Sequence, residues 1–315
     1  MKNRYTVVQA AVHSRKATFI QMKHFYRYLP VGEEVRRQSL FVVSGGYTLI
    51  PPHTPYPPLN HPDDHDLRWT QGRTLQEYQV IYITRGGGVF QSRLGGSAQI
   101  KAGMLFMLFP GEWHRYSPDL ETGWDEYWIG FQGKRAAELV AEYPLTTAQP
   151  VLNIGHSERL VEEFSRIFQE MRDEQVGYQK VIAAGALQVL AVAMAASLRQ
   201  NFAGTEIARV VEAAKANLRE RVHEPVNVEE LAVELGVGYC WFRRAFREYT
   251  GISPAQYHLQ LRIHHASELL RTTTLTVEAI GQRSGFESDN YFFRIFKKKM
   301  GYTPGAYRSM TNTDR

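Results

Sequence analysis

Two stretches near the C-terminal end of the chain carry side chains suited to binding a polyanion. Residues 241–258 read WFRRAFREYTGISPAQYH, and residues 291–308 read YFFRIFKKKMGYTPGAYR. Arginine and asparagine can read base edges in the major groove of DNA, whereas lysine more often contacts phosphate. Helical spacing turns two sets of side chains outward, namely Cys240, Arg243, Arg244 and Arg247, and Asn290, Phe293, Arg294 and Lys297. A solvated face or salt bridges would explain one such set, but its recurrence favours contact with double-stranded DNA.

The elements that must position these side chains are repeated as well. Short helices are expected after the caps Asn227 and Thr276, and turns at Gly236 and Gly285 lead into the longer basic-aromatic helices. A connecting helix is expected over 254–270. The pairs that are identical without a gap are Phe242 and Phe292, Arg244 and Arg294, Phe246 and Phe296, Gly251 and Gly301, Pro254 and Pro304, and Tyr257 and Tyr307. The period therefore predicts one helix-turn-helix unit used twice, with the phenylalanines on the core faces.

Overall charge and cysteine content constrain the class of protein less sharply. The net charge of +5 and pI near 9.2 allow a polyanionic partner without requiring one, so the local cluster at Arg294 and 297–299 is the better indication. The single cysteine, Cys240, excludes an internal disulfide framework and is interpreted as a small packing residue. The longest apolar run, 189–196, is too short to span a bilayer, and the N-terminal stretch lacks the features of a secretion signal. A soluble cytoplasmic protein without a membrane partner is expected.

The C-terminal stretch resembles the AraC/XylS-type DNA-binding domain. The resemblance covers residues 206–308 and includes AIGQRSGFESDNYFFRIFKKKMGYTPGAYR. Gly281 stands where alanine is usual, Ser288 where aspartate is usual and Asn290 where serine is usual; the glycine is expected to loosen helix packing. The resemblance implies a transcription factor whose two long helices enter successive major grooves of promoter DNA, about 34 Å apart. It also implies RNA polymerase as a partner and leans towards activation.

The first half of the chain has the pattern of a β domain followed by helices. Residues 40–152 read as short strands with Gly and Pro punctuation, which predicts an antiparallel barrel or jelly roll. The glycines at 45–46 and 86–88 are interpreted as turns and a bulge. Apolar residues recur at helical spacing after Ser157. The small-residue-rich segment 181–198 is either a dimer seam or a helix packed on the barrel of its own chain.

Residues Tyr78–Phe131 resemble the cupin-like sensor domain of sugar-responsive AraC-type regulators, through YQVIYITRGGG, IKAGMLFMLFPGEWHRY and WDEYWIGFQG. The resemblance implies an effector pocket formed by Thr48, Arg68, Tyr116, Glu126 and Trp128. Strand alternation places Glu126 inward with Trp124 and Trp128, and an inward carboxylate needs a polar partner. An indole or phenol can stack on a sugar ring while Arg and Glu bind its hydroxyls. Ordinary core packing of the tryptophans, and an Arg68–Asp66 pair, are the alternatives.

The expected architecture is α+β and multidomain, with an N-terminal antiparallel β barrel and a C-terminal all-α domain holding two helix-turn-helix motifs. The expected divisions are a tail over 1–21, a cupin-like effector-binding domain over 22–155, a helical dimerisation segment over 156–200, a linker over 201–205 and the DNA-binding domain over 206–310. A homodimer is expected.

Three functions compete for the barrel. A saccharide sensor is favoured, a barrel that only dimerises is one rival, and a metal-containing cupin enzyme fused to a DNA reader is the other. A metal site needs several converging His or carboxylate ligands, yet His114 stands alone, and His61 and His65 lie in a proline-rich loop. No metal, no cofactor and no enzymatic activity are therefore expected.

Overall fold

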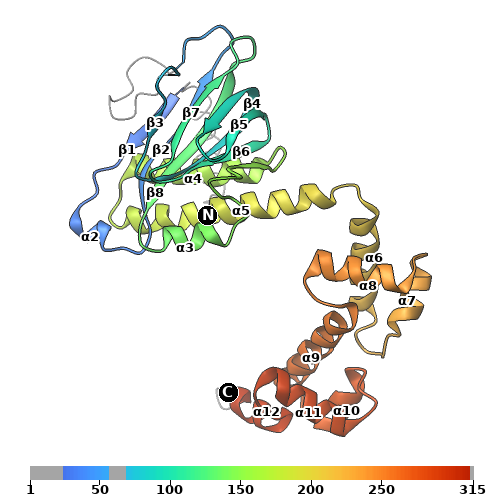
Figure 1. Cartoon of the computed structure of the whole chain (residues 1–315). Coiled ribbons are helices and arrows are strands. Elements are labelled where there is room, and N and C mark those ends of the chain that lie inside the picture. The colour runs from blue at the N-terminus through green and yellow to red at the C-terminus, as the bar shows by residue number, and fades with distance from the viewer. Residues whose placement is uncertain (1–23, 57–68, 313–315) are drawn as a thin grey trace, which may run out of the picture. The chain divides into compact units, whose positions relative to one another are not determined.

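The computed structural model describes residues 24–56 and 69–312 (Figure 1). The chain divides into two compact units, Met1–Asn201 and Phe202–Arg315. The boundary lies within the stretch 201–205 where a linker is expected. The tail expected over 1–21 lies outside the described residues, and so does Arg68.

The strands of the first unit form two antiparallel sheets that share one long strand. The strands are β1 (His24–Tyr28), β2 (Phe41–Ile50), β3 (Arg73–Thr74), β4 (Tyr78–Ser92), β5 (Gly96–Lys101), β6 (Met104–Leu108), β7 (Trp113–Pro118), β8 (Trp124–Gln132) and β9 (Val151–Asn153). The first half of β4 pairs with β8 and β6, and its second half pairs with β5 and β7. The main path runs β1-β2-β8-β4-β6-β9. Within the described residues, the two end strands do not pair, so the predicted barrel is instead an open two-sheet β domain.

Glycines explain how β4 leaves one sheet and joins the other. The pairing register shifts between Ile83 and Arg85, and Gly86 follows with a φ of +77°. A Cβ at Gly86 would lie 2.0 Å from the Gly123 carbonyl oxygen, so only glycine fits there. The shift lies at Thr84, just before the glycines at 86–88 where a bulge is predicted. Gly46, in contrast, lies inside β2 rather than in the predicted turn. A glycine is needed there because the backbone of β1 passes too close for a side chain.

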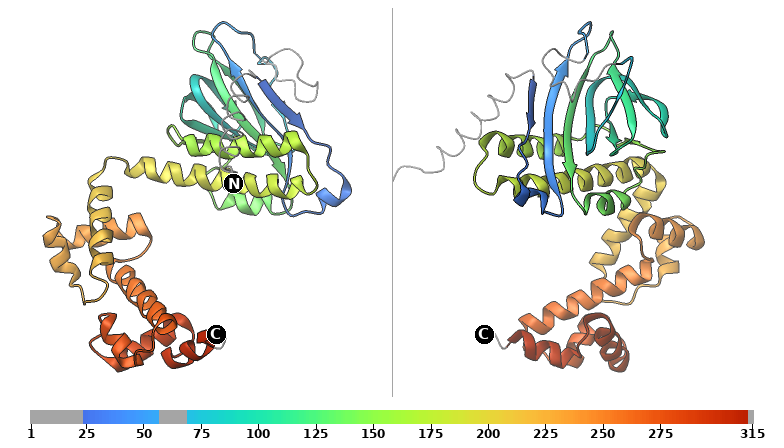
Figure 2. Two further views of the ribbon diagram at one scale, coloured as in Figure 1. Left: turned by 180° about the vertical axis from the view of Figure 1, so that it is seen from behind. Right: turned by 60° about the vertical axis from the view of Figure 1, so that its left-hand side comes forward.

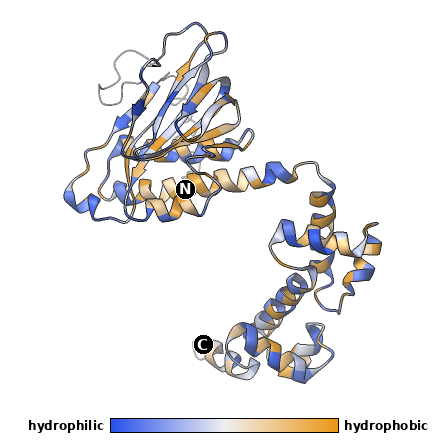
Figure 3. Cartoon of the chain, viewed as in Figure 1, coloured by the Kyte–Doolittle hydropathy of each residue, from blue (hydrophilic) through white to orange (hydrophobic). Residues whose placement is uncertain are grey.

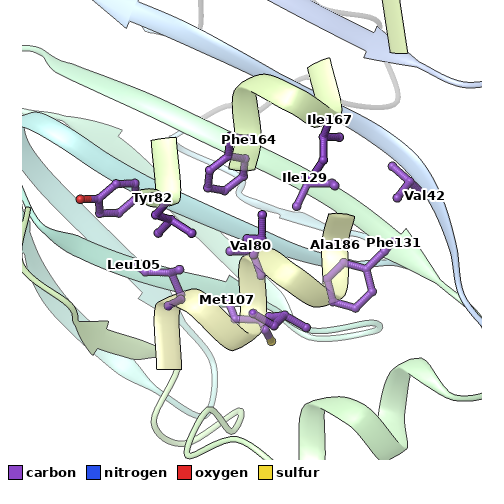
Figure 4. Packing of buried hydrophobic residues seen from close by; sticks show 14 of the residues in the cluster. Val42, Val80, Tyr82, Leu105, Met107, Ile129, Phe131, Phe164, Ile167 and Ala186 are labelled. Atoms are coloured by element: carbon purple, nitrogen blue, oxygen red, sulfur yellow. The ribbon is translucent and has the colours of Figure 1, made fainter. Parts of the chain in front are cut away.

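Helices cover one face of the larger sheet. They are α3 (Ala136–Ala141), α4 (Glu158–Asp173) and α5 (Tyr178–Phe202), and α4 and α5 lie along the sheet in both views of Figure 2. The short helix α2 (Glu33–Arg36) has no buried residue and does not belong to this layer. Val80 and Ile129 of the sheet pack with Phe164 of α4 and Ala186 of α5 (Figure 4). A second apolar cluster, which includes Phe106, lies between the two sheets. The first unit therefore has two core layers, with β4 and β8 between them.

Helix α5 is much longer than the uninterrupted apolar run within it, and most of its residues are apolar (Figure 3). It spans 25 residues and, alone among the described helices, is long and apolar enough by composition to cross a membrane. The uninterrupted apolar run 189–196 is thus only part of a longer apolar helix. Half of its apolar window is buried, and Ala186, Val189 and Leu190 belong to the core of the unit. This is the packing of a core helix, so one face of α5 packs on its own chain as the second alternative held.

The second unit consists of helices. They are α6 (Glu206–Glu220), α7 (Val228–Glu234), α8 (Tyr239–Thr250), α9 (Pro254–Thr272), α10 (Val277–Arg283), α11 (Asp289–Met300) and α12 (Pro304–Asn312). Asn227 and Thr276 cap α7 and α10 through their side chains, and Ser253 forms a capping box with Gln256. The two predicted helix-turn-helix motifs, α7–α8 and α10–α11, are confirmed with α9 between them.

The repeated phenylalanines form two separate cores, as predicted. Phe242 and Phe246 are fully buried in the first motif, and Phe292 and Phe296 in the second. Gly281, which was expected to loosen packing, does the opposite. A Cβ at Gly281 would lie 2.9 Å from Cδ1 of Phe292, so the glycine lets α10 and α11 approach closely.

Candidate functional sites

Helix α8 presents its predicted basic set to solvent. Cys240, Arg243, Arg244 and Arg247 are all exposed, and they line one open cleft together with Glu248 and Gln256. The interpretation of Cys240 as a packing residue is wrong, because its thiol belongs to this exposed face. The structure therefore brings together all four side chains of the first set.

Helix α11 presents the matching face. Asn290, Arg294 and Lys297 are exposed, whereas Phe293 is half-buried with its ring centroid 5.9 Å from that of Phe292. Glycines in the left-handed region end α8 at Gly251 and α11 at Gly301. The two faces thus begin and end at equivalent places in the repeat.

The cations on these faces lack acidic partners among the described residues. Neither Arg244 nor Arg294 forms an ion pair there. The Arg294 guanidinium instead lies 5.7 Å from the Tyr291 ring, and that of Arg243 lies 5.4 Å from the Tyr239 ring. An aromatic face restrains a guanidinium without neutralising it. The positive charge therefore remains available to a polyanion.

Arg262 of α9 holds the second motif, a role that nothing in the sequence pattern indicated. Its Nε donates to the Ser284 carbonyl at 2.9 Å, its Nη2 donates to the Gly285 carbonyl, and its guanidinium lies 4.1 Å from the Phe286 ring. The backbone of Glu224, which precedes α7, lies so close to Gly285 that a Cβ there would meet it at 3.0 Å. The turn of the second motif is thus held against both α9 and the segment that precedes α7.

A second candidate site lies between the sheets of the first unit. The Arg73 Nη2 donates to the Tyr116 hydroxyl at 2.9 Å, and its Nε donates to the His114 Nε2 at 3.4 Å. Glu126 lies on β8 of the opposite sheet, and its Oε2 accepts from the hydroxyl of Tyr56, in the loop after β2, at 3.4 Å. We call these five residues, Arg73, His114, Tyr116, Tyr56 and Glu126, the polar cluster.

Four of the five predicted effector residues lie in or beside the polar cluster. Thr48, Tyr116, Glu126 and Trp128 are all buried, and Thr48 pairs with Glu126 in the register of β2 and β8. Trp128 has its ring centroid 6.0 Å from that of Tyr28. The inward direction predicted for Glu126 with the tryptophans is confirmed, since all three are buried at the inner face of β8.

Arg73 is not among the predicted site residues, and His114 was expected to stand alone. His114 precedes Tyr116 by two residues on one strand, so alternation was a signal that both face inward. Arg73 had no such signal, because it enters the cluster through pairing of the two-residue β3 with β7, opposite His114. That pairing joins segments about forty residues apart and leaves no local pattern.

Burial sets the charge of the polar cluster. It raises the pKa of Glu126 to about 8, although Arg73, Tyr56 and Trp124 nearby favour the ionised form. Burial and then Arg73 lower the pKa of His114 to about 3. The His114 Nδ1 lies 3.1 Å from the Glu112 carbonyl, which can only accept, so Nδ1 carries the proton and Nε2 accepts from Arg73. At neutral pH the cluster therefore offers one fixed cation, a protonated carboxyl and a neutral imidazole.

Such a cluster is equipped to bind hydroxyl groups next to aromatic rings. Guanidinium, phenol and carboxyl groups supply donors and acceptors, and Trp128 and Tyr28 supply apolar faces. Within residues 24–56 and 69–312, no group of three or more His, Cys, Asp and Glu side chains is arranged to hold a metal ion. His61 and His65 lie outside the described residues.

Comparisons with known proteins match both units. Residues 231–310 match the family described as a helix-turn-helix domain, and residues 60–190 match the AraC-like ligand binding domain. The MmsAB operon regulatory protein of Pseudomonas aeruginosa is 28% identical over 237 residues, covering 74% of this chain and 75% of the relative. The arabinose operon regulatory protein of Salmonella typhimurium is 25% identical over 240 residues, covering 75% and 84%. The lactose operon transcription activator of Staphylococcus xylosus is 22% identical over 244 residues, covering 75% and 85%.

Proposed function

Because the chain belongs to the AraC-type transcriptional regulators, we propose that it binds promoter DNA through α8 and α11 and a small sugar through the polar cluster. The observation that carries the DNA assignment is the pair of equivalent, exposed basic faces without acidic partners among the described residues. Phosphate contacts and base readout both need cationic side chains that are not already neutralised by acidic side chains of the protein.

Arg244 and Arg294 test the DNA assignment, since they are the shared arginines of the two faces. Arg244→Ala and Arg294→Ala are each expected to weaken specific binding by about 1–3 kcal/mol. Arg209→Ala is a matched control, because Arg209 is an arginine of α6 that pairs with Glu206 at 3.6 Å. Fluorescence anisotropy on a DNA duplex selected with the full chain measures all three. Unchanged affinity of both variants would remove α8 and α11 from the groove.

The sugar assignment is supported by the chemistry of the polar cluster and by the names of two relatives. One is named for a lactose operon and another for an arabinose operon. A sugar would place its ring against Trp128 or Tyr116 and its hydroxyls against Arg73 and Glu126. A hydrocarbon ligand would leave the polar groups of this cluster without new partners, so the cluster suits a ligand with hydroxyl groups better.

A thermal-shift panel of pentoses, hexoses and disaccharides tests the sugar assignment. A binding sugar raises the melting temperature of the folded state by mass action. The rise should be absent in Glu126→Ala and present in Tyr127→Phe, because Tyr127 lies on the opposite face of β8 against α4. A panel without any shift, with an intact fold, would favour a β domain that only dimerises. Stoichiometric metal in the purified protein would favour an enzyme.

We propose further that the protein is a cytoplasmic homodimer that activates transcription with RNA polymerase. One relative is named an activator, and α5 keeps part of its apolar surface exposed beside α4. Regulation requires that the sugar bind two states of the protein unequally, so that DNA affinity or dimer geometry changes reciprocally. Reporter expression with and without the sugar gives the sign of regulation.

A further inference from the structure

The two DNA-facing helices are equivalent in fold but differ in the side chains they present. At three matched outward positions Cys240 stands against Asn290, Arg243 against Phe293, and Arg247 against Lys297. Only the arginine pair, Arg244 and Arg294, is shared. These differences are confined to exposed or half-exposed positions, whereas the buried phenylalanines of the two helices, Phe242 and Phe246 against Phe292 and Phe296, are identical. The fold therefore does not require them.

We propose that the two motifs read DNA of different composition. We call the base pairs that one helix contacts its box. Helix α8 reads a guanine-rich box, and α11 reads a box of A·T pairs with one guanine next to them. The inference rests on the proposed binding of DNA through α8 and α11 and deepens it. The bound DNA is then a site with a direction, in which the two boxes are not interchangeable.

The guanine preference of α8 follows from three arginines on one face. Guanine presents two acceptors, O6 and N7, to the major groove, and a guanidinium binds both at once. Arg243, Arg244 and Arg247 line one open cleft, so they can reach neighbouring base pairs or the adjacent phosphates. Tyr239 restrains Arg243 from the first turn of α8, which lowers the entropy lost when the guanidinium binds.

The A·T preference of α11 follows from Asn290 and Phe293. Asn290 lies in the first turn of α11, is exposed, and makes no hydrogen bond to another described residue through its amide. An amide of this kind binds adenine through N6 and N7. Phe293 is half-buried against Phe292, so its remaining surface is a fixed apolar edge of the face. Such an edge suits the C5 methyl group of thymine.

Contacts within the second unit fix the order of the two boxes. Arg262 of α9 holds the backbone of Ser284 and Gly285, and the segment before α7 packs on the same turn. The recognition helices thus cannot exchange places on the duplex. Helices that enter successive grooves on one DNA face lie about one duplex turn apart, or about 10.5 base pairs.

Selection from a library of randomised DNA duplexes, with the full chain and its variants, tests the inference. The wild type should select a guanine-rich box and an A·T box about one turn apart. Asn290→Ala and Phe293→Ala should relax the A·T box alone, and Arg243→Ala the guanine-rich box alone. Asn290→Gln, which keeps the amide, should retain part of the adenine preference.

Modified bases in the selected duplex test the atoms involved. Replacing thymine by uracil in the A·T box removes the methyl groups and should weaken wild-type binding several-fold, but should leave Phe293→Ala unaffected. Replacing guanine by 7-deazaguanine in the other box should weaken the wild type and affect Arg243→Ala less. Circular dichroism confirms that each variant is folded, so lost binding is not lost structure.

The possible outcomes separate the inference from the proposed function. A wild-type protein that enriches no sequence contradicts DNA reading by these helices altogether. Two boxes of the same composition, or relaxation of the guanine-rich box by Asn290→Ala, would overturn the inference while leaving DNA binding intact. Selective relaxation of one box by each variant, with uracil sensitivity that depends on Phe293, supports it.

Discussion

Arg73 on β3 and Tyr116 on β7 are joined by a hydrogen bond of 2.9 Å from the guanidinium Nη2 to the phenol oxygen. This bond fixes the charged end of Arg73 between the sheets. There its positive charge acts to lower the pKa of the Glu126 carboxyl on the opposite sheet. The guanidinium is therefore the one fixed cation of the polar cluster. A ligand that enters between the sheets meets a guanidinium already oriented by Tyr116.

Arg73→Ala should reduce affinity for the sugar that gives the largest thermal shift by about 10- to 100-fold. A hydrogen bond from a charged donor contributes about 1.5–3 kcal/mol, which corresponds to that change. Arg73→Lys should recover only part of the loss, because an ammonium cannot reproduce the guanidinium fork. Titration calorimetry measures the affinity. Arg135→Ala, at an exposed arginine beside α3, is the control and should bind normally.

Glu126 should make the first unit less stable as pH rises from 6.5 to 8. Its pKa of about 8 in the folded state exceeds its ordinary value of 4.5, so the folded state holds a proton that the unfolded chain releases. Stability is then lost up to the folded pKa. His114 acts oppositely, since its pKa falls from 6.5 to about 3, and it favours unfolding as pH drops below 6.5.

The two groups offset one another between pH 4.5 and 6.5, so the contribution of Glu126 is unopposed only above that range. Between pH 6.5 and 8 it should lower the free energy of unfolding by about 2 kcal/mol. Glu126→Gln should abolish this fall, whereas Glu138→Gln, an exposed carboxyl on α3, should not. Denaturant unfolding followed by tryptophan fluorescence measures it. Equal falls in the wild type and Glu126→Gln would contradict the assignment.

Features that depend on local sequence patterns were predicted better than features that depend on pairing between distant segments. Alternation along 124–128 placed Glu126 inward, and the caps Asn227 and Thr276 located the starts of α7 and α10. These features depend on neighbours within one turn or two strand residues. The repeat likewise predicted which side chains of α8 and α11 are exposed, apart from half-buried Phe293, because the shared phenylalanines turn equivalent positions outward.

The features that were missed depend on contacts between distant segments. Arg73 joins the polar cluster only through the pairing of β3 with β7, and Arg262 joins the second motif only because α9 crosses its turn. Apolar residues surround most of α5, so its sequence did not show which face packs on the sheet. The division into two sheets arises where β4 passes from one set of partners to another, which no periodicity within β4 records.

Gly281→Ala should destabilise the second unit by about 1 kcal/mol, although alanine is usual at this place in the family. Alanine favours a helix interior by about 1 kcal/mol over glycine. The new Cβ, however, would lie 2.9 Å from the ring of fully buried Phe292, and overpacking of a core costs about 1–3 kcal/mol. Gly305→Ala is the matched control, because nothing lies within 4 Å of a Cβ there. Thermal unfolding should show a lower melting temperature for Gly281→Ala but not for Gly305→Ala. A raised melting temperature in both variants would contradict close packing at Gly281.

Val181→Asp should convert the proposed homodimer to a monomer. Val181 is 52% exposed on α5 and lines a groove between α4 and α5, beside Gly185 and the acidic side chain of Glu163. In a two-fold interface each substitution occurs twice, so two new carboxylates would be buried near existing ones.

Val176→Asp is the control, because Val176 is fully exposed in the connection between α4 and α5. Sedimentation equilibrium of the full chain should give a dimer for the wild type and Val176→Asp and a monomer for Val181→Asp. A dimer in all three would place the interface elsewhere, and a monomeric wild type would exclude dimerisation through α5 in the absence of DNA.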